Sequence, residues 1–182
     1  MAETIYYAEA PSPLGELLLL SDGESLSGLY FAGHRRGPAP GADWRRDKGP
    51  FKQVEDELAR YFAGESCEFN VRLAPRGSEF QREVWNELRR IPPGATLTYA
   101  QLAARIGRPK AVRAAGAANA RNPISIIVPC HRVVGARGAL TGYAGGLERK
   151  EWLLRHETRL NAPVRVQAAS VAESVKIPCG GA

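Results

Sequence analysis

The pattern of hydrophobic residues changes type at residues 74–77, and this change constrains the fold more than any other feature of the chain. Before it, short apolar runs alternate with turns that contain Pro, Gly or Asp, which is typical of β-strands. After it, apolar residues recur at helical spacing behind N-capping motifs. The sequence therefore predicts an α/β chain of the α+β type, with a first domain at residues 1–74, a second at residues 78–160 and a disordered tail at residues 161–182.

The first domain is expected to contain an antiparallel sheet and one helix. Residues 5–9, 16–21 and 26–31 form three strands of a predicted meander, and residues 68–73 are a candidate for a further strand. Residues 33–49 have no periodicity and are expected to form a loop. Pro50 suits the first turn of a helix, apolar residues follow at helical spacing, and Gly64 ends the helix.

The second domain contains two capping boxes, Ser78-x-x-Gln81 and Thr98-x-x-Gln101, each of which opens a helix. A further helix is expected at residues 110–119 and a last one at residues 147–158. Two short helices joined by a tight turn with glycine form a helix-turn-helix pattern, although many helical pairs share it. The pattern favours DNA binding without establishing it.

Within the helix expected at residues 110–119, residues 111–118 are almost all small, and Arg113 is the one charged side chain among them. Small residues allow close packing against another helix, which is one interpretation. The other is insertion into the DNA minor groove, which is only about 6 Å wide and excludes a bulky helix. In that interpretation Arg113 probes or wedges the base stack.

Charge is distributed unevenly along the chain. Residues 88–147 contain no Asp or Glu and nine of the 25 basic residues, so the remainder has 16 basic and 19 acidic residues. A basic segment on an otherwise slightly acidic chain is typical of proteins that bind a polyanion, most simply nucleic acid. A solvated basic surface is the alternative.

The candidate chemistry lies at the adjacent residues Cys130 and His131. Residues 124–128 have the pattern of a buried strand that Pro129 ends, so the pair is expected where a strand gives way to a turn. Free cysteines are usually buried and inert, but a neighbouring histidine and a basic segment both favour the thiolate, which is the nucleophile. An unperturbed thiol is only about 3% ionised at pH 7, so His131 is the expected proton acceptor.

A carboxylate is expected to orient this histidine. The last helix offers Glu148, Glu151 and Glu157, which the sequence does not separate, and Glu157 at the helix end is the preferred candidate. Between Cys130 and that helix lies a glycine-rich segment with Tyr143 (residues 141–146). It is expected to wall a pocket for a flat ligand, or else to be an ordinary loop.

The three cysteines, Cys67, Cys130 and Cys179, form no CxxC pair, and their odd number fits no disulfide framework. No apolar run is long enough to span a membrane, and no secretory signal is visible. We therefore expect a reduced, cytoplasmic protein in which Cys179 is an exposed, non-catalytic thiol.

Four blocks of the chain, in the right order, resemble the O6-alkylguanine-DNA alkyltransferase family. The active-site signature is Pro-Cys-His-Arg-Val at residues 129–133, preceded by Asn-Pro at residues 122–123. Residues 113–119 resemble the recognition helix of the family, and residues 143–147 and 150–157 match two further blocks. The similarity covers residues 50–160, with a looser fit before them.

This resemblance implies a DNA repair protein that acts once. It would bind duplex DNA through the minor groove as a monomer, flip the damaged base, and move an alkyl group from guanine O6, and also from thymine O4, to Cys130. His131 would take the thiol proton through a water molecule, and Glu157 would orient His131. Asn122 would hold the turn, and Tyr99 would protonate or position the leaving base.

The resemblance also implies a ribonuclease H-like first domain and a winged helix-turn-helix in the second. The residues expected to line the base pocket are Val133, Tyr143, Ser125 and Ala144. The residues expected to contact DNA are Arg113, Thr98, Gln81, Ala114, Gly116, Ala117 and Arg121. No cofactor is expected, and no metal, because His34 and Cys67 are too few ligands for a zinc site in the first domain.

Two other functions fit these residues less well. A damage sensor that binds alkylated bases without repairing them would lack the cysteine, so the presence of Cys130 argues against it. A Cys-His hydrolase would need an oxyanion hole and repeated turnover, and it leaves the basic helix-turn-helix unexplained.

Overall fold

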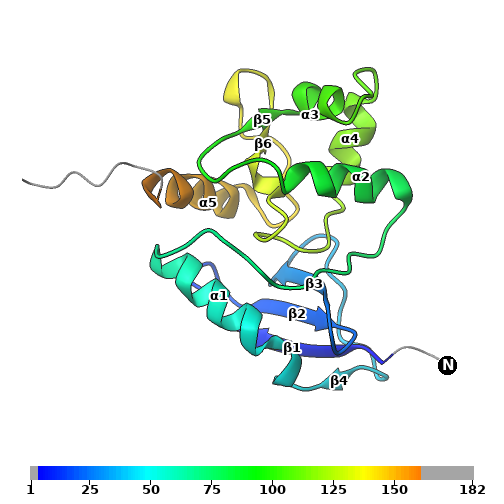
Figure 1. Ribbon diagram of the computed structural model, residues 1–182, viewed down its shortest axis with the longest axis vertical. Coiled ribbons are helices and arrows are strands. Elements are labelled where there is room, and N and C mark those ends of the chain that lie inside the picture. The colour runs from blue at the N-terminus through cyan, green and yellow to red at the C-terminus, as the bar shows by residue number, and fades with distance from the viewer. Residues whose placement is uncertain (1–3, 161–182) are drawn as a thin grey trace, which may run out of the picture.

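The computed structural model describes residues 4–160, and its first three strands form the predicted meander (Figure 1). Strand β1 (Tyr6–Ala10) pairs antiparallel with β2 (Leu17–Ser21), which pairs antiparallel with β3 (Leu26–Phe31). A two-residue strand, β4 (Arg45–Arg46), joins the sheet parallel to β1. It lies in the segment expected to be a loop, because two exposed arginines carry no apolar pattern that would reveal a strand.

The strand expected at residues 68–73 is absent except for one bridge. Leu73 pairs in parallel with Leu26, whose N–H donates to the Arg72 carbonyl. Farther along β3, Leu29 is bridged to Ile124 of the second domain. Two separate segments therefore share the outer edge of β3, and neither is long enough there to form a strand.

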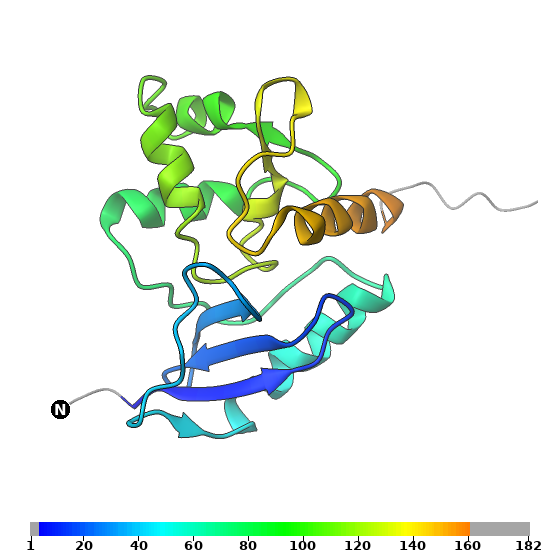
Figure 2. The ribbon, with the colours of Figure 1, turned by 180° about the vertical axis from the view of Figure 1, so that it is seen from behind.

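One helix packs against the sheet in the first domain (Figure 2). The helix α1 (Lys52–Ala63) follows a short 3-10 turn, η1 (Gly49–Phe51), with Pro50 in its first turn as expected. It ends at Gly64, whose φ of 81° suits glycine and whose N–H bonds the last carbonyls of the helix. Its buried face consists of Val54, Leu58 and Tyr61, with Glu57.

The second domain contains α2 (Glu79–Leu88), α3 (Tyr99–Arg105), α4 (Val112–Asn119) and α5 (Leu147–Leu160). Both capping boxes are formed, with Ser78 and Gln81 at α2 and Thr98 and Gln101 at α3. The short strands β5 (Leu97–Thr98) and β6 (Val133–Val134) pair in parallel, and β6 follows the 3-10 turn η2 (Cys130–Arg132). A further 3-10 turn, η3 (Ala136–Gly138), follows β6.

The prediction of a buried strand at residues 124–128 is wrong. These residues are buried, but they form turns, and Ile126 has a left-handed backbone with φ of 69°. Bonds within the segment replace those of a ladder: the N–H of Val128 donates to the Ile124 carbonyl, and that of Ile127 to Ser125. Burial on all sides gives a turn the same apolar pattern as a central strand.

A continuous hydrophobic core joins the two halves of the described chain. Both views place α5 beside α1, with the sheet on one side and the helices α2–α4 on the other (Figures 1 and 2). No helix within residues 4–160 is long and apolar enough to cross a membrane. The tail expected at residues 161–182, with Cys179, lies outside the described residues.

Candidate active site

The thiol of Cys130 lies at the start of η2 and is held by the side chain of Asn122. The Asn122 amide donates to the Cys130 sulfur (3.1 Å) and to the backbone carbonyls of Val128 (2.8 Å) and Ile124 (3.2 Å). Its oxygen accepts from the N–H of Ile124 at 3.0 Å. Because one buried side chain satisfies several backbone groups of this turn, the position of the thiol depends on it.

Electrostatics at the thiol differ from the expectation drawn from the sequence. Burial raises the pKa of Cys130, and it outweighs the hydrogen bond from Asn122 and the nearby charge of Lys150, which both lower it. The adjacent Arg132 turns away from the thiol, toward Glu157 and the Ile91 carbonyl. The thiol is therefore held protonated, and a base is needed to form the thiolate.

His131 contacts Glu157, the preferred one of the three candidate carboxylates. Its Nε2 lies 2.8 Å from Glu157 Oε1, and both side chains are fully buried. Arg132 forms a fork on the same carboxylate, with Nε 2.7 Å from Oε2 and a terminal nitrogen 2.9 Å from Oε1. Glu148 is exposed, and Glu151 pairs with Arg155 on the surface.

Protonation states follow from these contacts. Hydrogen bonds from His131 and Arg132 outweigh burial and hold the pKa of Glu157 well below its ordinary value, so the carboxylate is ionised. An ionised carboxylate only accepts, so Nε2 of His131 carries its proton. Burial lowers the pKa of His131, which leaves the ring neutral with a lone pair on Nδ1. Nδ1 is therefore the nitrogen that can take a proton.

Lys150 also belongs to this site, although no role is predicted for it from the sequence. Its ammonium is fully buried and donates to the carbonyls of Val133 (2.6 Å) and Thr141 (3.0 Å). Burial lowers the pKa of Lys150 to about 8, and the interaction with Cys130 opposes this. The helical spacing could have indicated a buried role for Lys150. It lies on the same face of α5 as Leu153 and Glu157, and all three are buried.

Of the four residues expected to form a base pocket, Tyr143 is the one that the structure brings to the thiol. Tyr143 and Ser125 are buried, and the Tyr143 hydroxyl interacts electrostatically with Cys130 and Ser125. Val133 is fully buried in β6, and Ala144 is half-buried. The hydroxyl of Tyr99 lies 3.3 Å from the carbonyls of Thr141 and Gly142, which places the glycine-rich segment beside α3.

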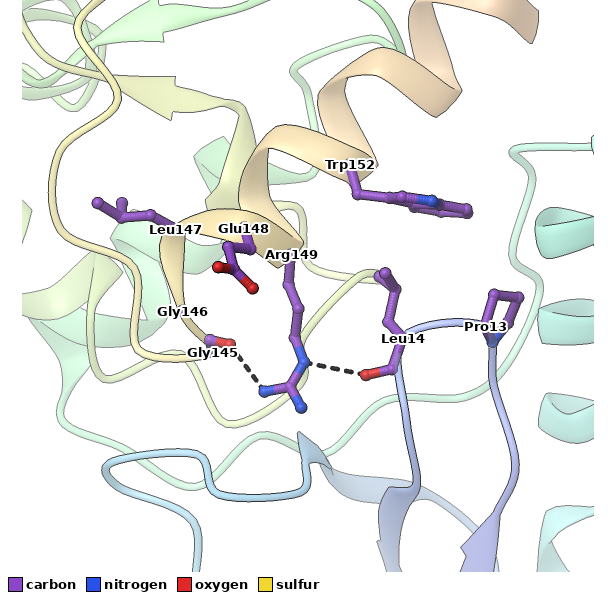
Figure 3. Close-up of a pocket in the computed structure, with 8 residues that line it drawn as sticks. All are labelled: Pro13, Leu14, Gly145, Gly146, Leu147, Glu148, Arg149 and Trp152. Atoms are coloured by element: carbon purple, nitrogen blue, oxygen red, sulfur yellow. Dashed lines mark hydrogen bonds between the residues drawn. The ribbon is translucent and has the colours of Figure 1, made fainter.

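The glycine-rich segment is also tied to the first domain. Arg149 donates to the Gly145 carbonyl (2.9 Å) and to the Leu14 carbonyl in the β1–β2 turn (3.0 Å), as Figure 3 shows. Trp152 and Leu147 help to line a cavity of about 830 Å³ at this junction. Neither Cys130 nor any of the four residues expected at the base pocket lines that cavity, so it is separate from the thiol.

The helix α4 presents different faces to the protein and to solvent. Ala115 and Ala118 are buried in the core, which supports the interpretation of close packing for that face. The residues expected to contact DNA on this helix are on the other side: Arg113, Ala114 and Ala117 are exposed, and Gly116 is half-buried beside the Tyr99 ring. The structure therefore shows close packing for one face of the helix and leaves the face with Arg113 exposed.

The other three residues expected to contact DNA lie at the ends of helices. Arg121 is exposed just after α4. The side chains of Gln81 and Thr98 are occupied in the two capping boxes, where the Gln81 oxygen accepts from the N–H of Ser78 and the Thr98 hydroxyl from that of Gln101.

Fold and site together define a helix-turn-helix domain built around a buried cysteine with a histidine–carboxylate pair. Residues 79–159 match the family described as 6-O-methylguanine DNA methyltransferase, DNA binding domain. Residues 5–75 match the corresponding ribonuclease-like domain. The chain belongs to the 6-O-methylguanine DNA methyltransferase family.

Individual proteins agree with this assignment. A methylated-DNA–protein-cysteine methyltransferase of Methanosarcina acetivorans is 50% identical over 153 residues, which cover 84% of this chain and 98% of that protein. The crystal structure of Mycobacterium tuberculosis O6-methylguanine methyltransferase superposes with a TM-score of 0.80 and 46% sequence identity. The match covers 88% of this chain and 96% of that protein's chain. An M. tuberculosis structure in complex with DNA has the same identity and TM-score, with 85% and 94% covered.

Proposed function

We propose that this protein repairs DNA by direct reversal of damage, transferring a methyl or larger alkyl group from O6-alkylguanine, and also from O4-alkylthymine, to its own Cys130. The observation that carries this proposal is the buried thiol held by Asn122 beside the His131–Glu157 pair. Membership of the family supports it, since relatives are named methylated-DNA–protein-cysteine methyltransferases. The protein would be an enzyme that acts once.

In the proposed reaction Nδ1 of His131 takes the thiol proton through a water molecule, while Glu157 holds the ring by Nε2. The sulfur then forms a bond to the alkyl carbon as the bond from that carbon to guanine O6 breaks. The restored guanine gains a proton from Tyr99. His131 then releases the thiol proton to water and Tyr99 regains one from water, so the thiol has lost one proton and the guanine has gained one. A thioether cannot leave as a thiolate does, so each molecule reacts once.

We infer that duplex DNA binds through its minor groove to a monomer, against the exposed face of α4. The exposed face of that helix is made of Arg113 and small residues, and a narrow groove admits such a face. Arg113 would fill the place of the flipped base, which offsets an unstacking cost of about a few kcal/mol. The pocket of Tyr143, Ser125, Val133 and Ala144 would receive the base, in a reduced cytoplasm where the thiol persists.

The first test is the intact mass of the protein before and after mixing with a duplex that carries one O6-methylguanine, followed by peptide mapping. We expect a gain of one methyl group on the Cys130 peptide that stops at one per protein. The Cys130→Ala variant should gain none, and the Cys67→Ala variant should still gain one, because Cys67 is not among the groups that act on the Cys130 thiol. Unchanged mass with tight, lesion-selective binding would identify a damage sensor instead.

Arg113→Ala is expected to slow transfer from duplex DNA by roughly tenfold or more, because the vacancy left by the flipped base loses its wedge. Transfer from the free base O6-methylguanine should be unchanged, because no flipping is needed. Single-turnover rates on both substrates measure the two effects. Arg137→Ala, at an exposed arginine of η3, is the matched control. Equal loss on both substrates would refute the role given to Arg113.

A further inference from the structure

A phenol from the first domain reaches the carboxylate that holds His131. Tyr61 lies on α1, is fully buried, and donates its hydroxyl to Glu157 Oε1 at 2.9 Å. The same oxygen accepts from Nε2 of His131 at 2.8 Å. The contact of Tyr61 with Glu157 links residues 96 positions apart in the chain. The first domain therefore directly touches the Glu157–His131 pair, which we call the proton relay.

A second contact fixes this arrangement. His156, the neighbour of Glu157, bonds through Nε2 to the backbone carbonyl of Tyr61 at 2.6 Å, and the two rings meet edge to face at 5.1 Å. Both ribbon views show α1 and α5 side by side at this place (Figures 1 and 2). The backbone of Tyr61 is therefore held independently of its hydroxyl, so removal of the hydroxyl alone should leave the helices docked.

The hydroxyl of Tyr61 is a permanent donor. Burial and the negative charge of Glu157 raise the pKa of Tyr61 far above its ordinary value, so it stays protonated. Glu157 accepts four hydrogen bonds in all, one from Tyr61, one from His131 and two from Arg132. Three of these bonds reach Oε1 and one reaches Oε2, so both oxygens are engaged and the carboxylate is held in a single orientation.

We propose that Tyr61 is a positioning residue of the relay, whose hydroxyl fixes Glu157 and limits the negative charge that Glu157 presents to His131. The first domain then completes the active site rather than only supporting it. The proposal rests on the proposed function through the role of His131 as the base.

The charged groups around His131 decide the direction of the effect. Glu157 raises the pKa of His131, whereas Arg132 and Lys150 lower it together with burial. Cys67 also lies near Glu157, but its own pKa is raised by burial, so it remains a neutral thiol. Without the Tyr61 hydroxyl, Glu157 Oε1 loses one hydrogen-bond donor, so more of its negative charge acts on His131. The imidazolium form of His131 is then stabilised, and the pKa of His131 rises.

The test is Tyr61→Phe, which removes one oxygen, compared with Tyr30→Phe, a half-buried tyrosine of β3. In Tyr61→Phe, the acid limb of the pH–rate profile for methyl transfer should lie about half a pH unit above that of the wild type. On that limb the rate should be roughly threefold lower than in the wild type, because a protonated His131 accepts no proton. The rate at higher pH should approach that of the wild type. Tyr30→Phe should leave the profile in place.

A second readout needs no DNA. The chain has only three histidines, so NMR titration of the His131 ring is assignable with the His131→Gln variant. We expect the titration midpoint to move up in Tyr61→Phe and to stay in Tyr30→Phe. A purely structural role would lower the melting temperature of Tyr61→Phe and leave both the pH–rate profile and the His131 titration unchanged. That result would overturn the proposal. If the wild type transfers no methyl group, the proposed function fails, while the titration still decides the role of Tyr61.

Discussion

Glu157→Gln is expected to lower the rate of methyl transfer by about a thousandfold, the range in which loss of general-base catalysis falls. A neutral amide cannot hold the proton on Nε2 of His131 and stabilise the imidazolium, as the buried carboxylate does at 2.8 Å. Single-turnover transfer from a methylated duplex measures the change. Glu151→Gln is the matched control, because Glu151 is a glutamate of the same helix whose partner Arg155 is exposed.

The same substitution should also lower the free energy of unfolding by about 3 kcal/mol, because it leaves the buried Arg132 without its ionic partner. The pKa of Glu157 lies below its ordinary value in the folded state, so its contribution is complete above the unfolded pKa and is lost as pH falls below that value. The difference between wild type and variant in urea unfolding should therefore shrink from pH 7 toward pH 3. Glu151→Gln should change stability by less than about 1 kcal/mol. Equal effects of the two variants on rate and stability would refute the assignment of Glu157.

The sequence predicted those parts of the fold whose signals are local. Capping boxes at Ser78 and Thr98 and the glycine at Gly64 mark helix ends through bonds within a few residues, and the structure confirms all three. The meander is local in the same sense, because each strand pairs with the next. By contrast, β4 and the bridges of Leu73 and Ile124 depend on partners far along the chain.

The resemblance to the family predicted the main residues of the candidate site, but their contacts needed the structure. The contact of His131 with Glu157 rather than with Glu148 or Glu151 needed the structure, since all three lie on one helix. The contribution of Tyr61 had no local signal, because it looks like one more apolar residue on the buried face of α1. Its polar atom acquires a role only through α5, 96 residues later.

Asn122→Ala is expected to lower the free energy of unfolding by about 3 kcal/mol, because a buried donor and acceptors of the turn lose their partner at once. The N–H of Ile124 and the carbonyls of Ile124 and Val128 all bond the Asn122 amide, within a segment that water does not reach. The strained backbone at Ile126, with φ of 69°, is held by the same turn, so it is also expected to relax. Urea unfolding measures the stability change.

Methyl transfer by Asn122→Ala should fall by about a hundredfold or more, because the amide that donates to the Cys130 sulfur at 3.1 Å is one of the groups that lower the thiol pKa. The pH at which the thiol ionises, followed by thiolate absorbance, should rise. Asn119→Ala is the nearby control, since Asn119 makes only a long 3.4 Å bond to the Cys130 carbonyl and should cost less in both measurements. Asn70→Ala, at an exposed asparagine, should change neither. A stable Asn122→Ala protein with an unchanged thiol titration would show that the turn holds Cys130 without this side chain.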